Sequence, residues 1–269
     1  MYTEFYGFRE PPFNITPDPR FLFFSDRHRE AYNHLLFGIR ERKGFIQLTG
    51  EVGAGKTTLC RKLLEDLGPE VRTALILNPT MTAPQLLRAI LVELGLEPAR
   101  DRVRCLAALN RFLLERIAAG DEVVLVVDEA QDLSRELLEQ VRLLSNLETD
   151  QRKLLQIVLV GQPELRDMLD APRLRQLRQR ITVRYHLAPL SRDETAHYVQ
   201  FRMQVAGGNS RPTFNRWALR SIYRYSRGVP RLINAVCDQT LLCGYVTESD
   251  RLLGRHVRRA IRELEGETS

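Results

Sequence analysis

Cysteine is scarce in this sequence, and its few copies show no metal-binding pattern. Cys60, Cys105, Cys237 and Cys243 are scattered through 269 residues and include no Cys-x-x-Cys pair. In a chain of this length, such spacing excludes a disulfide framework and indicates a reduced, cytosolic protein. We expect all four to be small side chains buried in the core.

Long hydrophobic runs are also missing. The longest stretch without a charged residue, 73–87, is interrupted by Asn78, Pro79, Pro84 and Gln85, whereas a transmembrane helix needs about 20 apolar residues. The first residues lack the basic and apolar regions of a secretory signal. Because 43% of the residues are hydrophobic, the chain can still bury a core. These features predict a soluble, cytoplasmic protein.

Negative charge is absent from one part of the chain. No acidic residue lies between Glu194 and Asp238, although the window contains several arginines. Three of them, Arg216, Arg220 and Arg224, recur every fourth residue and would line one helix face. Arginine binds phosphates and carboxylates in a bidentate manner. This face is therefore expected either to be solvated beside a core-facing Trp217 or to bind an acidic partner.

Short apolar runs alternate with helical patterns over the first two thirds of the chain. Strands are predicted at 44–49, 73–77, 123–127, 155–160 and 181–186, and helices at 57–67, 84–94, 105–119 and 137–147. The unbroken β-branched run at 123–127 is typical of a strand covered on both faces. This alternation predicts a doubly wound, mostly parallel α/β sheet.

After Pro189 only helical patterns remain, over 193–205, 214–225, 230–242 and 250–264. We therefore predict two domains. Residues 1–189 form a nucleotide-binding core that includes a Pro-rich, aromatic N-terminal arm, and residues 190–269 form a helical lid.

One segment carries a phosphate-binding motif. It fits G-x-x-x-x-G-K-[ST] and lies directly after a predicted strand and before a predicted helix, the context that the motif requires. The backbone N–H groups of such a loop curl around phosphates, and the helix N-terminus adds a favourable dipole. Lys56 would reach the β- and γ-phosphates of ATP, and Thr57 would bind Mg²⁺. The predicted phosphate-binding residues are Gly50, Glu51, Val52, Gly53, Ala54, Gly55, Lys56, Thr57 and Thr58.

A pair of acidic residues follows the strand at 123–127. Asp128 can hold the hydration shell of Mg²⁺, and Glu129 can orient and deprotonate an attacking water. Motifs of other P-loop proteins are missing: there is no Asn-Lys-x-Asp for guanine and no Leu-Ser-Gly-Gly-Gln. Residues 128–131 resemble a helicase motif, but a chain with one predicted sheet cannot supply the second motor domain that such a helicase needs. What remains is an ATPase with a helical lid.

The sequence resembles the ExeA/GspA type of AAA+ ATPases, which are associated with the general secretion pathway. The resemblance spans nearly the whole chain and is carried by residues 5–13, 16–19, 50–58, 128–131, 159–165, 179–181 and 228–234. It implies a five-stranded parallel αβα core, a C-terminal helical lid, and ATP-driven action of an oligomer in secretion. It also allows a peripheral position at the inner face of the membrane.

The resemblance assigns roles to further residues. Gln162 matches the first sensor, which contacts the γ-phosphate or the lytic water, and Arg231 matches the second sensor, a lid arginine that reaches the nucleotide phosphates. Arg180 matches the arginine finger that a subunit offers to its neighbour's ATP. Arg175 and Arg178 are rivals for that role. The arm is expected to contribute to the adenine pocket with Phe13, Phe21 and Phe24.

Three functions stay open at this point. The leading one is Mg²⁺-dependent ATP hydrolysis by a homo-oligomer, a ring or filament, that acts with a secretion or membrane-associated protein. The second is a DNA-binding AAA+ regulator like the target selectors of transposons, which the arginine-rich lid favours and the missing helix-turn-helix signature disfavours. The third is a nucleotide-dependent scaffold, disfavoured by Glu129. Full-length relatives of this type continue into a transmembrane segment and a peptidoglycan-binding region, so a shortened chain and a short cytosolic branch are both open.

Overall fold

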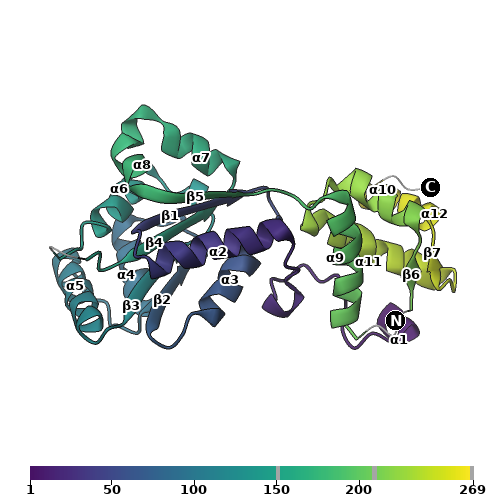
Figure 1. The fold of residues 1–269 in the computed structure, drawn as a ribbon, viewed down its shortest axis with the longest axis horizontal. Helices are drawn as coiled ribbons and strands as arrows, with labels where there is room; N and C mark the ends of the chain where they lie inside the picture. The colour runs from purple at the N-terminus through teal and green to yellow at the C-terminus, as the bar shows by residue number, and fades with distance from the viewer. Residues whose placement is uncertain (150–151, 208–210, 267–269) are drawn as a thin grey trace. The chain divides into compact units, whose positions relative to one another are not determined.

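The computed structural model describes residues 1–149, 152–207 and 211–266, which fold into two compact units (Figure 1). The sheet unit comprises Arg29–Gly50 and Leu59–Leu187. The helical unit comprises Met1–His28, Glu51–Thr58 and Ala188–Ser269. The N-terminal arm thus clusters with the C-terminal helices, whereas the sequence grouped it with the core. The boundary between residues 189 and 190 stays a prediction.

The sheet unit contains five parallel strands, as predicted. They are β1 (Phe45–Gly50), β2 (Val71–Ile76), β3 (Glu122–Val127), β4 (Gln156–Gly161) and β5 (Ile181–Leu187), in the spatial order β2-β3-β4-β1-β5. Since all strands run the same way, the carboxyl ends of β1, β3 and β4 share one edge of the sheet. Ligands of open α/β sheets bind at this edge.

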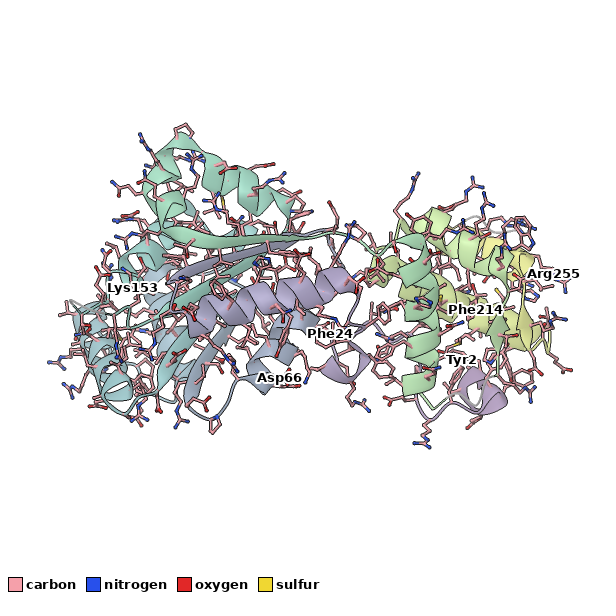
Figure 2. All side chains as sticks on the ribbon, viewed as in Figure 1. Tyr2, Phe24, Asp66, Lys153, Phe214 and Arg255 are labelled. Carbon is pink, nitrogen blue, oxygen red and sulfur yellow. The ribbon has the colours of Figure 1, made fainter. Side chains whose placement is uncertain are left out.

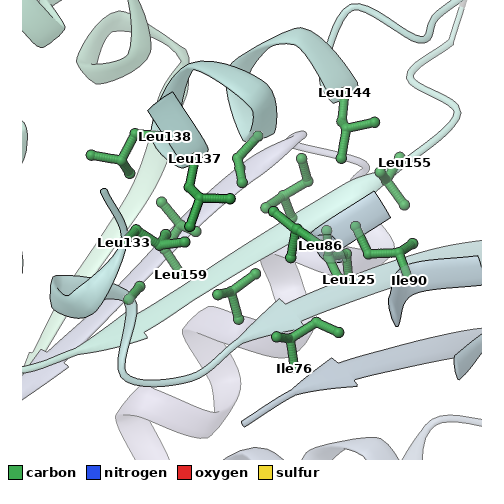
Figure 3. Close-up of a cluster of buried hydrophobic side chains, with 14 of the residues drawn as sticks. Ile76, Leu86, Ile90, Leu125, Leu133, Leu137, Leu138, Leu144, Leu155 and Leu159 are labelled. Carbon is green, nitrogen blue, oxygen red and sulfur yellow. The ribbon is translucent and has the colours of Figure 1, made fainter. Parts of the chain in front are cut away.

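Helices cover both faces of the sheet because alternate side chains of each buried strand point to opposite faces. One face packs against a large cluster of buried residues from α4 (Ala83–Glu93), α5 (Arg102–Ala118), α6 (Arg135–Leu144), α7 (Pro163–Asp170) and α8 (Arg175–Arg180). Figure 3 shows Leu137 of α6 pointing toward Leu159 of β4 within this cluster. Short 3₁₀ turns η2 (Ala130–Asp132) and η3 (Pro172–Leu174) connect these elements.

The other face carries α2 (Asp26–Arg40) and α3 (Lys56–Asp66) (Figure 1). Helix α2 lies close to β1 at Gly38, where an added Cβ would be 2.6 Å from the Cδ1 atom of Ile46. The Tyr32 hydroxyl of α2 donates to Asp66 of α3 at 2.9 Å, which joins the two helices. The sheet unit is therefore the αβα sandwich that the sequence predicts.

The helical unit has a hydrophobic core of its own. Its helices are α9 (Arg192–Val205), α10 (Arg216–Ser226), α11 (Pro230–Val246) and α12 (Gly254–Leu264). Two short strands, β6 (Thr213–Phe214) and β7 (Arg251–Leu252), pair in parallel beside them. The buried residues of this core and those of the sheet unit form separate clusters.

The N-terminal arm completes the core of the helical unit. It contains a short helix α1 (Tyr2–Tyr6), which the sequence did not predict, and a turn η1 (Pro19–Phe21). Figure 2 shows Tyr2 and Phe214 among the side chains of this unit. The rings of Phe13 and Phe214 meet edge to face at 6.4 Å, and Phe21 is also buried. With their rings in the core, Phe13 and Phe21 offer no exposed face to adenine.

A buried arginine holds the arm in place. Arg202 of α9 donates from Nε to the Pro12 carbonyl at 2.6 Å and from Nη2 to the Asn14 carbonyl at 2.8 Å. Its guanidinium also lies 4.4 Å from the ring centroid of Phe21. A buried guanidinium is tolerated when its donors are hydrogen-bonded. These contacts fix the irregular part of the arm on the helical unit.

The four cysteines are buried and form no disulfide bonds, as the sequence predicts. Burial raises the pKa of the Cys243 thiol to about 11 and raises the pKa of Cys237 further above its ordinary value. Both thiols are therefore protonated at neutral pH and weakly reactive. Among the described residues, no helix is both long and apolar enough to cross a bilayer.

Candidate phosphate-binding site

The P-loop follows β1 directly and leads into α3, as the motif requires. Gly53 and Gly55 have φ values of +76° and +97°, a backbone region that side-chain-bearing residues rarely adopt. Gly50 is needed for a different reason, because an added Cβ would lie 2.6 Å from the Leu187 carbonyl oxygen. Alanine would therefore be unfavourable at each motif glycine, because of backbone strain at Gly53 and Gly55 and a steric clash at Gly50.

Two residues from outside the P-loop segment contact its backbone carbonyl groups. The Arg231 N–H, at the start of α11, donates to the Gly53 carbonyl at 3.2 Å. A Cβ added to Gly53 would lie 2.4 Å from the Cβ of Arg231, so the helix packs on the bare loop backbone. The ring of His28, in the first turn of α2, contacts the Ala54 carbonyl through Nε2 at 3.1 Å. Sequence reasoning missed His28.

Lys56 opens α3 and lies over its own loop. Its ammonium group donates to the Glu51 carbonyl at 3.0 Å, and its side chain is only 6% exposed. The Ala54 N–H donates to the same carbonyl at 3.1 Å. The loop is thus closed on itself, with its one cationic side chain at the helix N-terminus, where the dipole also favours an anion.

The end of β3 carries the acidic pair. Asp128 is buried, and its N–H extends the pairing with β2 by donating to the Ile76 carbonyl at 2.8 Å. Glu129 has a left-handed backbone with φ 50°, and its N–H donates to Asp128 Oδ1 at 2.9 Å. A non-glycine residue in this conformation is strained and persists where the surroundings fix it. The left-handed backbone of Glu129 thus ends the extended conformation of the chain directly after Asp128.

Two amide side chains converge on Glu129. Its Oε2 accepts hydrogen bonds from Gln131 Nε2 at 2.8 Å and from Gln162 Nε2 at 3.3 Å. Gln131 Oε1 in turn accepts from the Gln162 N–H at 3.0 Å, which joins the ends of β3 and β4. The structure thus brings together Glu129 and Gln162, which the sequence predicted separately. Gln131 was missed as a site residue, although it stands in the motif at 128–131.

The candidate arginine fingers lie at the opposite edge of the sheet. Arg180 directly precedes β5, and Phe45 at the start of β1 is opposite Ile181. Gly50 is five residues further along β1, or about 16 Å at ~3.3 Å per residue. Arg180 therefore lies near the amino ends of the strands, far from their carboxyl ends, where the P-loop begins.

The three rival arginines differ in their surroundings. Arg180 is half-buried and donates to the Ser145 hydroxyl. Arg178 is exposed and lies 3.6 Å from the Asp170 carboxylate, whereas Arg175 is exposed at the start of α8. These differences do not assign the finger.

The arginine stripe on α10 is exposed along its length, and so is the tryptophan beside it. Trp217 is 67% exposed, so the prediction of a core-facing Trp217 is wrong. The core is instead filled by Ala218 and Ile222. Arg220 lies 5.9 Å from the Trp217 ring centroid, and Arg255 of α12 points outward from the same unit (Figure 2).

Comparison with known proteins connects this geometry to a family. A family model described as an AAA domain matches residues 39–169. General secretion pathway protein A from Aeromonas hydrophila is 50% identical over 268 residues, which are 99% of this chain and 49% of that protein. The chain thus spans about half the length of this curated relative.

Solved structures share the fold at low identity. Drosophila ORC bound to DNA is 20% identical with a TM-score of 0.72, over 94% of this chain and 64% of that chain. The RuvB Holliday junction branch migration motor of Thermotoga maritima is 18% identical with a TM-score of 0.59, over 90% of this chain and 69% of that chain. The chain therefore contains an AAA domain, and its similarity to General secretion pathway protein A, which its motifs resemble, extends over nearly its whole length.

Proposed function

We propose that the chain binds ATP and hydrolyses it with the help of Mg²⁺. The observation that carries this proposal is the P-loop, whose glycines adopt the required conformations and whose carbonyls are held from outside. In such a loop the N–H groups turn inward toward phosphates. Residues 50–58 are the proposed phosphate-binding residues, with Lys56 at the β- and γ-phosphates and Arg231 as a further phosphate contact from the lid.

The proposed magnesium ligands are Thr57 and Asp128. A hydroxyl and a buried carboxylate are the hard oxygen donors that Mg²⁺ prefers. When bound, Mg²⁺ neutralises phosphate charge. The chemistry of these two donors therefore fits a Mg²⁺ site.

Glu129 is the proposed general base. Within the described part of the chain, the amides of Gln131 and Gln162 both donate to Oε2, which leaves the other carboxylate oxygen to take a water proton. Gln131 positions this carboxylate, and Gln162 links it to the end of β4, where it would also sense the γ-phosphate. The test is phosphate release from MgATP by the purified chain, with EDTA as the metal-free control; no release at any protein concentration would refute the proposal.

We further propose that the active form is a homo-oligomer, with residues 1–189 as the nucleotide-binding core and 190–269 as its lid. Arg180 supports this, because an arginine before β5 is distant from the carboxyl edge of its own sheet and suited to a neighbour's ATP. Arginine fingers stabilise the charge of the transition state.

Arg180→Ala should then lower the hydrolysis rate by about 10³-fold or more while keeping ATP affinity. Wild-type activity should rise steeply with protein concentration, and mixing Arg180→Ala with Glu129→Gln should restore some activity. Phosphate release across a dilution series measures all three. Arg178→Ala is the matched control, because Arg178 lies on the same short helix and faces Asp170. A monomer that hydrolyses ATP at the full rate at high dilution would contradict the assembly.

The proposed partner is a secretion or membrane-associated protein with an acidic surface. The support is the similarity to General secretion pathway protein A and the exposed arginines of α10, which complement acidic groups. The alternative is a DNA-binding regulator. It is favoured by the same arginines and by the likeness to an ORC structure bound to DNA.

Changing Arg216, Arg220 and Arg224 together to Glu should leave basal ATP hydrolysis within about twofold of wild type, because none of them contacts the P-loop in this proposal. We expect wild-type protein to bind duplex DNA only weakly at physiological salt. Titration with a duplex at several salt concentrations measures this, with the triple Arg→Lys variant as a charge-conserving control. Tight wild-type binding that falls steeply with salt and disappears in the Glu variant would favour the DNA regulator instead.

A further inference from the structure

His28 occupies a buried position next to the P-loop. It lies in the first turn of α2 and is 3% exposed. Its Nδ1 is 2.8 Å from the Ser25 hydroxyl, and its Nε2 is 3.1 Å from the Ala54 carbonyl. Both ring nitrogens are thus engaged, one by the residue just before the helix and the other by the loop backbone.

These partners fix the protonation of the ring. A carbonyl oxygen only accepts, so Nε2 must carry the proton that is donated to Ala54. Burial lowers the pKa of His28, although the Ala54 carbonyl and the charge of Glu194 act in the opposite direction. The ring is therefore neutral near pH 7, and Nδ1 accepts from the Ser25 hydroxyl. Ser25 Oγ also accepts the His28 N–H at 3.3 Å.

The contact with Ala54 controls a peptide plane of the P-loop. In a trans peptide the C=O of one residue and the N–H of the next point in opposite directions. With the Ala54 C=O held by His28, the Gly55 N–H is directed to the other side. Gly55 has φ +97°, and as a glycine it lacks the Cβ that would otherwise restrict rotation of this peptide.

The neighbouring peptide is held differently. The Gly53 C=O accepts from the Arg231 N–H, and the N–H of the same peptide donates to the Glu51 carbonyl. Both of its polar groups are thus bonded inside the protein. In the Ala54–Gly55 peptide, by contrast, a side chain rather than backbone holds the C=O group and so sets the direction of the N–H group.

We propose that His28 is a positioning residue of the P-loop, which holds the Ala54 carbonyl so that the Gly55 N–H faces the nucleotide phosphates. This inference rests on the proposed ATP binding. The ring acts as a neutral donor at one fixed point, Nε2, and takes no part in the chemical step. Its loss leaves a buried carbonyl without this donor and frees the peptide to rotate.

The position of the donor can be tested with two amide variants. His28→Gln places an amide nitrogen near the site of Nε2, whereas His28→Asn places one near the site of Nδ1. We expect His28→Ala and His28→Asn to bind MgATP about tenfold more weakly than wild type, and His28→Gln to bind within about threefold. His34→Ala is the matched control on the same helix, since His34 is exposed and stacks on Tyr185 at 5.2 Å.

The readout is the dissociation constant of MgATP for each full-length variant, with thermal melting to confirm that each is folded. A rescue by Gln but by neither Asn nor His28→Met supports the positioning role, because Met fills about the same volume as Gln and lacks the donor. His28→Ala binding like wild type, or equal binding by the Gln and Asn variants, would overturn it. Failure of wild-type protein to bind MgATP would instead refute the proposed function.

Discussion

Lys56→Ala is expected to abolish measurable ATP binding. Lys56 is the only cationic side chain within residues 50–58, and the proposal gives it contacts with two phosphate groups. Charge-assisted hydrogen bonds contribute about 1.5–3 kcal/mol each, so losing both should weaken binding at least a hundredfold. The measurement is a calorimetric or fluorescence titration with MgATP.

The same helix provides a control for this variant. Lys62 lies on α3 too, but its ammonium group pairs with Asp66 at 2.6 Å near the surface. Lys62→Ala should therefore keep wild-type affinity, because a surface ion pair of this kind contributes little. If Lys56→Ala bound MgATP as tightly as Lys62→Ala does, the P-loop would not be the nucleotide site.

Glu129→Gln should keep ATP binding and stop hydrolysis. The amide has the shape of the carboxylate and can still accept a hydrogen bond from Gln131 through its oxygen, but it cannot take a proton from water. The hydrolysis rate should fall by about 10²- to 10⁴-fold with little change in affinity. Single-turnover phosphate release separates this effect from binding.

Asp132→Asn is the matched control for the base. Asp132 lies three residues further along, in the same turn, and is exposed. It should hydrolyse ATP at the wild-type rate. A Glu129→Gln protein that turned over as fast as Asp132→Asn would mean that another group activates the water.

Strands β1, β3 and β4 could be predicted because they are buried on both faces, whereas β2 and β5 were recognised from shorter apolar patterns with exposed or half-buried residues. All five predicted runs overlap β1 to β5, including the β-branched run that became β3. Helices α7 and α8 were not predicted, because both are too short for a sustained apolar repeat; α7 begins with Pro163, and α8 follows the proline-containing turn η3. The helix predicted from 250 begins only at Gly254, since Arg251 and Leu252 pair with β6.

The candidate site also contains parts that the sequence predicted and contacts that it did not. Motifs identified the P-loop and the acidic pair, because each consists of residues that are consecutive in the sequence. The contact of His28 with Ala54 could not be read in this manner, because the partner is a backbone carbonyl 26 residues away. The link between Gln131 and Gln162 depends on β3 and β4 being adjacent, which no local pattern reveals.

The arm that completes the helical unit is synthesised before the helices on which it packs. The hydroxyl of Tyr2 donates to Asp238, which is 236 residues later in the chain, and Arg202 reaches back 190 residues to Pro12. At about 5–20 residues per second on the ribosome, these partners emerge roughly tens of seconds after the arm. Throughout that time Phe13 and its aromatic neighbours have no core to enter. Until α11 has been synthesised, the aromatic side chains of the arm therefore lack the core that they fill in the folded unit.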